Sequence, residues 1–208
     1  MRAPLARLGL VAVLLVPGAQ ASASPSCHVA APSLSADLAL ACARVLAAVP
    51  GWDGRGTVQM GDGDAAVAGE TVGTVVTLHR AAWARLTPAG RQEVLTHELV
   101  HVATADVTGV PQWLQEGFAE AVALRGSGIP DRVAATELAT SYRLPDALPT
   151  DHDFEVDPAV SYQESWLAVD LLRREHGDAW VLRLYRGEVV PDADLLVELR
   201  AEIRRRLW

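Results

Sequence analysis

The 208-residue sequence contains no lysine, so arginine supplies all 18 basic side chains against 26 acidic ones. The formal net charge at pH 7 is −8. Binding to nucleic acid or to an anionic membrane surface depends on a surplus of basic side chains, so we expect neither as a partner. The lack of lysine beside abundant alanine and valine is typical of a GC-rich bacterial genome.

Long apolar runs are also lacking. The run near the N-terminus, Leu8 to Val16, is too short to span a bilayer as a helix. Arg2 and Arg7 precede it, and the small residues of Ala19-Gln20-Ala21 offer a cleavage site. This order of a basic segment, an apolar segment and small residues predicts a secretory signal peptide over residues 1–21.

The predicted leader places the remainder of the chain outside the cytoplasm, secreted or otherwise extracytoplasmic. Cleavage after Ala23 is the alternative. Loss of residues 1–21 removes two arginines and no acidic residue, which changes the net charge from −8 to −10. Residues 22–208 are enough for one domain with a core, and no candidate membrane span follows the leader. We therefore expect a single domain with no stable membrane anchor.

Cysteine is scarce, and its two occurrences are Cys27 and Cys42. An exported chain is oxidised, so we expect a disulfide between them that ties the mature N-terminus to a helix over 35–49. A loop of this size is worth about 3 kcal/mol in the entropic model. A lipid on Cys27 is less favoured, because Ser-Pro-Ser at 24–26 lacks the usual aliphatic residue. A second metal bound by cysteine lacks companion ligands at a suitable spacing.

The most specific pattern present is His97-Glu98-Leu99-Val100-His101. Residues four apart on an α-helix are separated by about 6 Å along the axis and about 40° around it. Two imidazoles then project from one face, as two ligands of one Zn²⁺ require. Thr87-Pro88 is typical of a helix start, so we expect a helix over 88–104. The alternative is a core helix without metal, but its buried polar groups would then need other partners.

A second segment, Trp113 to Glu120, supplies the remaining candidate ligand. Catalytic zinc keeps three protein ligands and one open position, and Glu116 lies on a helix expected over 112–124. Glu120 falls one turn further along the same face, where it can accept the free N–H of a zinc-bound histidine. The alternative for both is a solvated glutamate on an amphipathic helix.

Together the two segments resemble the gluzincin zinc metallopeptidases, the thermolysin-like clan, and most closely its short peptidase MA-like domains. Those domains pair a His-Glu-x-x-His helix with a following Trp-Leu-x-Glu-Gly-x-Ala-Glu helix, and both stretches match here, at 97–101 and 113–120. A weaker resemblance covers residues 71–208. A metzincin is excluded, because no glycine and third histidine follow His101 at the required spacing.

The resemblance implies one Zn²⁺ per chain and a role for each of five residues: the zinc ligands His97, His101 and Glu116, the general base Glu98, and Glu120 as the partner of a zinc-bound histidine. Zinc lowers the pKa of its bound water toward about 7, and the base accepts the proton. Gluzincins often stabilise the oxyanion with a Tyr or His from a later helix, for which we favour Tyr162. His152 and Tyr142 are alternatives, and a core position for Tyr162 is a further one.

We expect an α+β fold, in which a small N-terminal β-sheet packs on a mostly helical zincin domain that carries the HExxH helix. Strands are expected at 57–60 and, from the alternation of apolar and β-branched residues, at 71–79. In gluzincins the strand before the zinc helix lies along the cleft, where an extended peptide pairs with it. Later in the chain we expect helices at 130–142, 158–177, 178–186 and 192–207, and a surface loop over 143–157.

The resulting functional hypothesis is an exported zinc-dependent peptidase. It hydrolyses peptide bonds through a zinc-bound water activated by Glu98, and its substrate is a peptide or protein bound in extended form. One alternative is a zinc amidase that acts on a non-peptide or cell-wall amide. The other is a zinc-bearing peptide-binding protein without turnover, against which the intact Glu98 argues.

Overall fold

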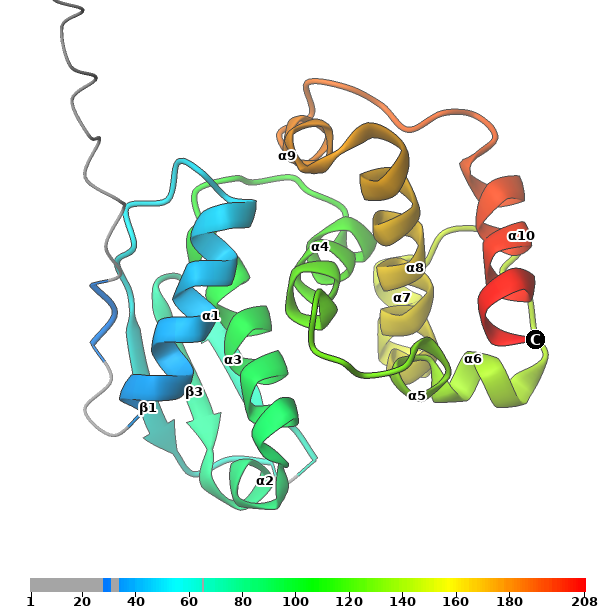
Figure 1. Ribbon diagram of the computed structural model, residues 1–208. Helices are drawn as coiled ribbons and strands as arrows, with labels where there is room; N and C mark the ends of the chain where they lie inside the picture. The colour runs from blue at the N-terminus through cyan, green and yellow to red at the C-terminus, as the bar shows by residue number, and fades with distance from the viewer. Residues whose placement is uncertain (1–27, 31–33, 65) are drawn as a thin grey trace, which may run out of the picture.

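A computed structural model describes residues 28–30, 34–64 and 66–208, in which the chain forms ten helices and three strands. The fold is α+β, with a small sheet beside a larger set of helices (Figure 1). The sheet consists of β1 (Thr57–Gly61), β2 (Gly69–Val72) and β3 (Val75–His79). Across the described part of the chain, no helix combines the length and apolarity needed to span a membrane.

The helices follow in chain order around this sheet. Their bounds are α1 (Ser35–Ala48), α2 (Arg80–Arg85), α3 (Pro88–Ala103), α4 (Gln112–Leu124), α5 (Asp131–Ala134), α6 (Thr136–Ser141), α7 (Asp151–Val156), α8 (Pro158–His176), α9 (Asp178–Tyr185) and α10 (Leu195–Leu207).

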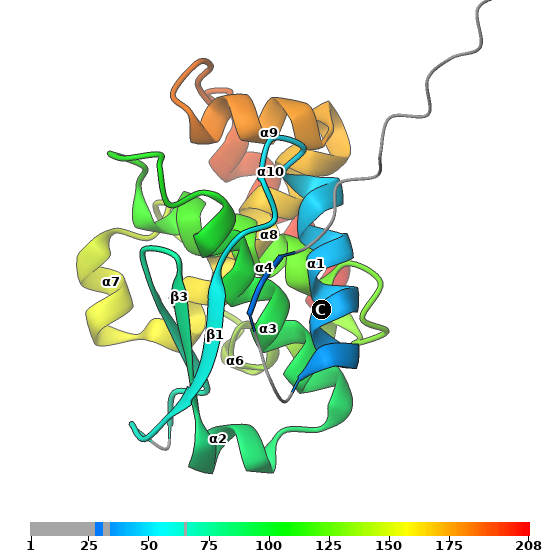
Figure 2. The same cartoon turned by 90° about the vertical axis from the view of Figure 1, so that its left-hand side faces the viewer.

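The sheet has the strand order β1-β3-β2, with β1 parallel and β2 antiparallel to β3. Val76 and Leu78 of β3 are fully buried, and in Figure 2 the helices α3, α4 and α8 lie behind the strands. The prediction of a single strand over 71–79 is wrong. Gly73 has a φ of +59°, a conformation that glycine adopts without strain, and the chain reverses there into a hairpin. As a result β2 forms an edge of the sheet.

Helix α3 contacts α1, α4, β2 and β3. Its buried Leu95 and Leu99 belong to one core cluster with Leu114 and Phe118 of α4. Helix α4 in turn packs on α8, so that the helices form successive layers away from the sheet (Figure 1). The sheet and α4 thus flank the helix that carries the His-Glu-x-x-His pattern.

Local signals explain where the two central helices begin. The hydroxyl of Thr87 accepts a hydrogen bond of 3.1 Å from the N–H of Gly90, and Pro88 follows it at the first turn of α3. This confirms the expected start of α3, and α4 has the predicted bounds, 112–124.

The interpretation of 143–157 as a loop is wrong in part, since this segment contains α7. Thr150 donates to Asp153 there in a capping box that the sequence analysis missed.

Two further expectations concern other parts of the chain. The segment 130–142 forms the two short helices α5 and α6 in place of one helix. Cys42 on α1 is buried and disulfide-bonded. Its expected partner Cys27 lies outside the described residues, as does the leader expected over 1–21. The pairing and the cleavage site remain predictions.

Gly117 allows close packing between α4 and α8 and provides a test of this fold. A Cβ added there would press on the backbone oxygen of Ser165 and lie 2.8 Å from a methyl of Val169. We expect Gly117→Ala to lower the free energy of unfolding by about 1–3 kcal/mol, since the overlap outweighs alanine's better helix propensity.

Gly90 is the matched control, because it is also helical but its added Cβ would lie 3.5 Å from the nearest side-chain atom, an ordinary contact. Gly90→Ala should leave stability unchanged or raise it by up to about 1 kcal/mol. Denaturant unfolding of both variants measures the difference. Equal stability of the two variants would contradict the close α4–α8 packing.

Candidate metal centre

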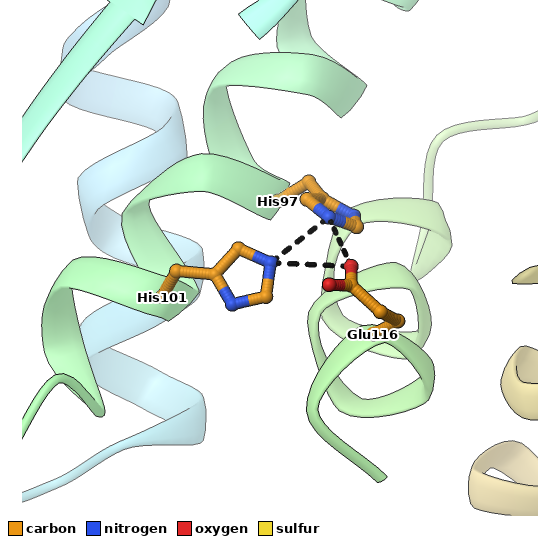
Figure 3. Close-up of side chains that lie close together, drawn as sticks. All are labelled: His97, His101 and Glu116. Carbon is orange, nitrogen blue, oxygen red and sulfur yellow. Dashed lines mark hydrogen bonds and ion pairs between the residues drawn. The ribbon is translucent and has the colours of Figure 1, made fainter. Parts of the chain in front are cut away.

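Three potential ligand atoms meet between α3 and α4. His97 and His101 project from neighbouring turns of α3, and Glu116 faces them from α4 (Figure 3). His97 Nε2 lies 3.1 Å from His101 Nε2 and 3.1 Å from Glu116 Oε2. His101 Nε2 lies 3.3 Å from the same carboxylate oxygen. The three atoms therefore form a nearly equilateral triangle.

This triangle has the dimensions of one face of a tetrahedral zinc site. Bonds of about 2.0–2.1 Å to zinc place tetrahedral ligand atoms about 3.3–3.4 Å apart. The observed edges of 3.1 to 3.3 Å agree with this to within a few tenths of an ångström. Two imidazoles and one carboxylate are also a donor set that zinc uses in catalytic sites. The residues present therefore fit a zinc ion with one position left open.

Glu120 holds the other side of His97. Its Oε2 lies 3.0 Å from His97 Nδ1. If that nitrogen carries the proton and donates it to Glu120, Nε2 of the neutral ring presents a lone pair to the triangle. This is the carboxylate–histidine arrangement that fixes the tautomer and direction of a metal-binding ring. The expected contact of Glu120 with one of the two histidines is therefore present.

The charges around these histidines favour a cation at the centre. Burial by itself would lower the pKa of His97, but Glu116 and Glu120 raise that pKa well above its ordinary value. Burial would likewise raise the pKa of Glu116, yet its contacts with His101 and His97 lower it to about 2. Both shifts mean that the carboxylates stabilise positive charge here, which a proton or a metal ion can supply.

Glu98 lies beside the triangle and outside it. Its side chain is buried on α3 and accepts a hydrogen bond of 2.6 Å from the hydroxyl of Thr71 on β2. Its carboxylate is not part of the group formed by the three candidate ligands, but Glu98 lines the same cavity. This is the placement expected of a base that acts on a water next to the metal.

Tyr162, on α8, lines the same cavity as the three candidate ligands. Its ring centroid lies 6.1 Å from that of His97 and 5.3 Å from that of Phe154. Burial and then the nearby Glu116 and Glu98 raise the pKa of the Tyr162 hydroxyl, so this group keeps its proton and can donate it in a hydrogen bond.

The two alternatives to Tyr162 lie elsewhere. Tyr142 is 69% exposed and its ring packs against that of Trp208. The side chain of His152 is 77% exposed and pairs with Glu155 on the surface of α7. Neither residue lines the cavity that holds the candidate ligands.

The cavity has a volume of about 470 Å³ and runs along the open edge of β2. Gly69 and Thr71 of that strand line it together with the three candidate ligands. Thr104 and Tyr185, whose hydroxyls are 3.1 Å apart, also line it. Of the segment 71–79, which was expected as one strand along a cleft, the part in β2 lines this cavity and β3 does not.

Several residues of the site carried no recognised signal in the sequence. Thr71 donates a hydrogen bond to Glu98, and Gly69 lies against the Glu98 side chain. Tyr185 of α9 lines the same cavity. Burial and the charge of Glu120 raise the pKa of Glu93 to about 7. Its position four residues before His97, on the same helix face, is the one signal that could have drawn attention to it.

The sequence therefore predicted which residues come together around His97, and the fold adds the strand that lines the cavity. Comparisons of the chain with protein-family models, with curated protein sequences and with solved structures find no match. The interpretation of this site rests on its own geometry and chemistry.

Proposed function

We propose that this chain is an exported zinc-dependent peptidase of the gluzincin type. The observation that carries the proposal is the triangle formed by His97 Nε2, His101 Nε2 and Glu116 Oε2, with edges of 3.1 to 3.3 Å. A metal-binding protein without catalysis needs nothing more than these ligands. Glu98, buried beside the triangle and not part of it, favours hydrolysis over simple metal binding.

The proposed chemistry assigns a proton transfer to Glu98. When bound, zinc polarises a carbonyl group and makes a water molecule more acidic. The Glu98 carboxylate accepts a proton from the attacking water, whose oxygen bonds to the carbonyl carbon. Glu98 then passes this proton to the amide nitrogen as the carbon–nitrogen bond breaks. Glu120 keeps His97 oriented throughout, through its contact of 3.0 Å with Nδ1.

Tyr162 is the proposed donor to the oxyanion. Negative charge develops on the carbonyl oxygen as the water attacks, and a fixed hydrogen-bond donor there lowers the barrier. The raised pKa of Tyr162 keeps its hydroxyl protonated, and the T-shaped contact with Phe154 on α7 restrains its ring.

The open edge of β2 supports a substrate in extended form. His79 N donates to Ala68 O over 3.0 Å, and hydrogen-bonded pairs alternate along an antiparallel ladder. Gly69 and Thr71, paired with Leu78 and Val76, therefore direct their backbone groups away from β3. These groups face the cavity edge, where a peptide or protein segment can add as a further strand.

The same residues would serve two alternative functions. A zinc amidase acting on a non-peptide or cell-wall amide needs the same ligands and base, and a peptide-binding protein without turnover needs the ligands and the open strand edge. A substrate panel that contains both peptides and non-peptide amides distinguishes these alternatives from the proposed peptidase.

The first prediction concerns the metal. The purified chain without its leader should hold about one zinc, because three ligands converge on one point. His101→Ala and Glu116→Ala should each weaken zinc binding by more than about 100-fold, since loss of a ligand's supporting partner alone costs 10- to 100-fold. Metal analysis and competition with a chelator measure this.

Matched controls lie on α7, where His152 and Glu155 carry the same side chains in exposed positions. His152→Ala and Glu155→Ala should keep the zinc affinity of the wild type. Circular dichroism shows whether each variant is folded. A folded Glu116→Ala protein with full zinc and full activity would mean that Glu116 is not a ligand.

The second prediction separates the base from the ligands. Glu98→Gln should keep zinc and fold, because Glu98 is not a ligand, while turnover falls by about 10²–10⁴-fold because the amide cannot accept the proton. Cleavage of a mixed peptide library, followed by mass spectrometry, measures turnover. Activity equal to that of the wild type would rule out this mechanism. A zinc-loaded wild type that cleaves no peptide would favour one of the alternative functions.

The third prediction concerns the oxyanion donor. Tyr162→Phe should lower kcat by about 10²–10³-fold and change KM little, since the lost hydrogen bond forms in the transition state. The control is Tyr142→Phe, whose ring packs on the surface against Trp208, and it should be fully active. Steady-state kinetics of both variants provide the comparison, and an unchanged kcat for Tyr162→Phe would exclude Tyr162 from this role.

A further inference from the structure

A hydrogen bond joins the edge strand of the sheet to the candidate base. The hydroxyl of Thr71 donates to Glu98 Oε2 over 2.6 Å and also lies 3.2 Å from the Glu98 backbone oxygen. Glu98 is 7% exposed, so its carboxylate is largely removed from water. Within the described residues, the bond from Thr71 is the one hydrogen bond found for this carboxylate. A buried carboxylate that loses its donor is destabilised, so the bond restrains the side chain strongly.

Gly69 lies two residues earlier on β2 and faces the same way as Thr71. A Cβ added at Gly69 would lie 3.2 Å from Glu98 Oε1 and 3.1 Å from Glu98 Cγ. Any side chain at position 69 would therefore press on the Glu98 carboxyl group next to Oε1, which glycine avoids. The two carboxylate oxygens thus differ in their surroundings, since Oε2 accepts a hydrogen bond from Thr71, whereas Oε1 lies beside Gly69 and has no hydrogen bond among the described residues.

We propose that Thr71 is a positioning residue for Glu98, and that Oε1 is the oxygen that exchanges the proton. This inference rests on the proposed hydrolytic function. The water's O–H bond breaks as an O–H bond forms on Oε1, and the water oxygen bonds to the carbonyl carbon. The proton then moves from Oε1 to the amide nitrogen as the carbon–nitrogen bond breaks. Throughout, the hydroxyl of Thr71 keeps Oε2 occupied and the carboxylate in one orientation.

The same two residues also direct backbone groups toward the open edge of β2. Substrate docking and placement of the base therefore depend on one short segment, Gly69 to Thr71. When a substrate pairs with this edge, the Glu98 carboxylate is already held in a fixed position relative to β2. An error of about 1 Å in the position of a reacting group can cost 10²-fold in rate, so this restraint bears directly on turnover.

The test compares Thr71→Val, which removes the hydroxyl at nearly constant shape, with Thr71→Ser, which retains it. In the zinc-loaded protein, Thr71→Val should lower kcat by about 10- to 100-fold with KM little changed, and Thr71→Ser should restore most of the loss. Gly69→Ala should also lower kcat, since its methyl group would press on the Glu98 carboxyl group next to Oε1. The control is Thr77→Val, because Thr77 lies on the opposite face of the hairpin and accepts a bond from Gln59.

A second readout does not depend on activity. Thr71→Val should lower the unfolding temperature when Glu98 is present, because a buried carboxylate then lacks its donor. The same substitution should cost much less in a Glu98→Ala background. Equal costs in both backgrounds would mean that the hydrogen bond contributes nothing, and would overturn the inference.

The outcomes distinguish this inference from the proposed function. An inactive Glu98→Gln together with a fully active Thr71→Val would overturn the inference alone, as would a Thr71→Ser as impaired as Thr71→Val. A Glu98→Gln as active as the wild type would overturn the proposed function and with it the role of Thr71 in catalysis. We expect every variant to hold as much zinc as the wild type. Loss of zinc in Thr71→Val would mean that Thr71 supports the metal site and not the base, and would overturn the inference.

Discussion

The packing of α3 against α4 is the contact on which the candidate site depends. It places a glutamate of one helix 3.1 to 3.3 Å from two imidazole nitrogens of the other. Buried Leu95 and Leu99 of α3 and Phe118 of α4 lie in the core cluster that holds the helices together. Two imidazoles and two carboxylates that lie this close together, largely removed from water, are unfavourable unless a positive charge lies between them. The raised pKa of His97 means that the carboxylates stabilise a proton on this ring. A bound zinc ion would supply the positive charge in place of that proton.

The edge strand gives the site its second component. Helices α3 and α4 alone supply ligands, but the carboxylate of Glu98 is held from the sheet, by Thr71. Within the part of the chain that the structure describes, this strand pairs on one side, with β3, and the outward backbone groups of Gly69 and Thr71 face its open edge along the cavity. In the proposed function, α3 supplies two metal ligands and the base, α4 supplies the third ligand, and β2 restrains the base and docks the substrate. Tyr162 on α8 lines the same cavity.

The sequence predicted the parts that depend on local pattern. A capping threonine, a proline and periodic apolar residues set the start of α3, and the four-residue spacing of His97 and His101 placed both rings on one face. The hairpin was missed because alternation continues through Gly73, where the backbone reverses. The contact between Thr71 and Glu98 spans 27 residues, and the one between Gly117 and Ser165 joins two helices. Such contacts follow from tertiary packing and leave no local periodicity.

The central claim is that His97, His101 and Glu116 bind one zinc ion and leave Glu98 free. The most direct measurement is a crystal structure of the zinc-loaded protein, with diffraction recorded on both sides of the zinc absorption edge. We expect one anomalous peak about 2.0–2.2 Å from His97 Nε2, His101 Nε2 and a Glu116 oxygen. A peak at another site, direct binding of zinc by Glu98, or no peak under zinc-saturating conditions would contradict it.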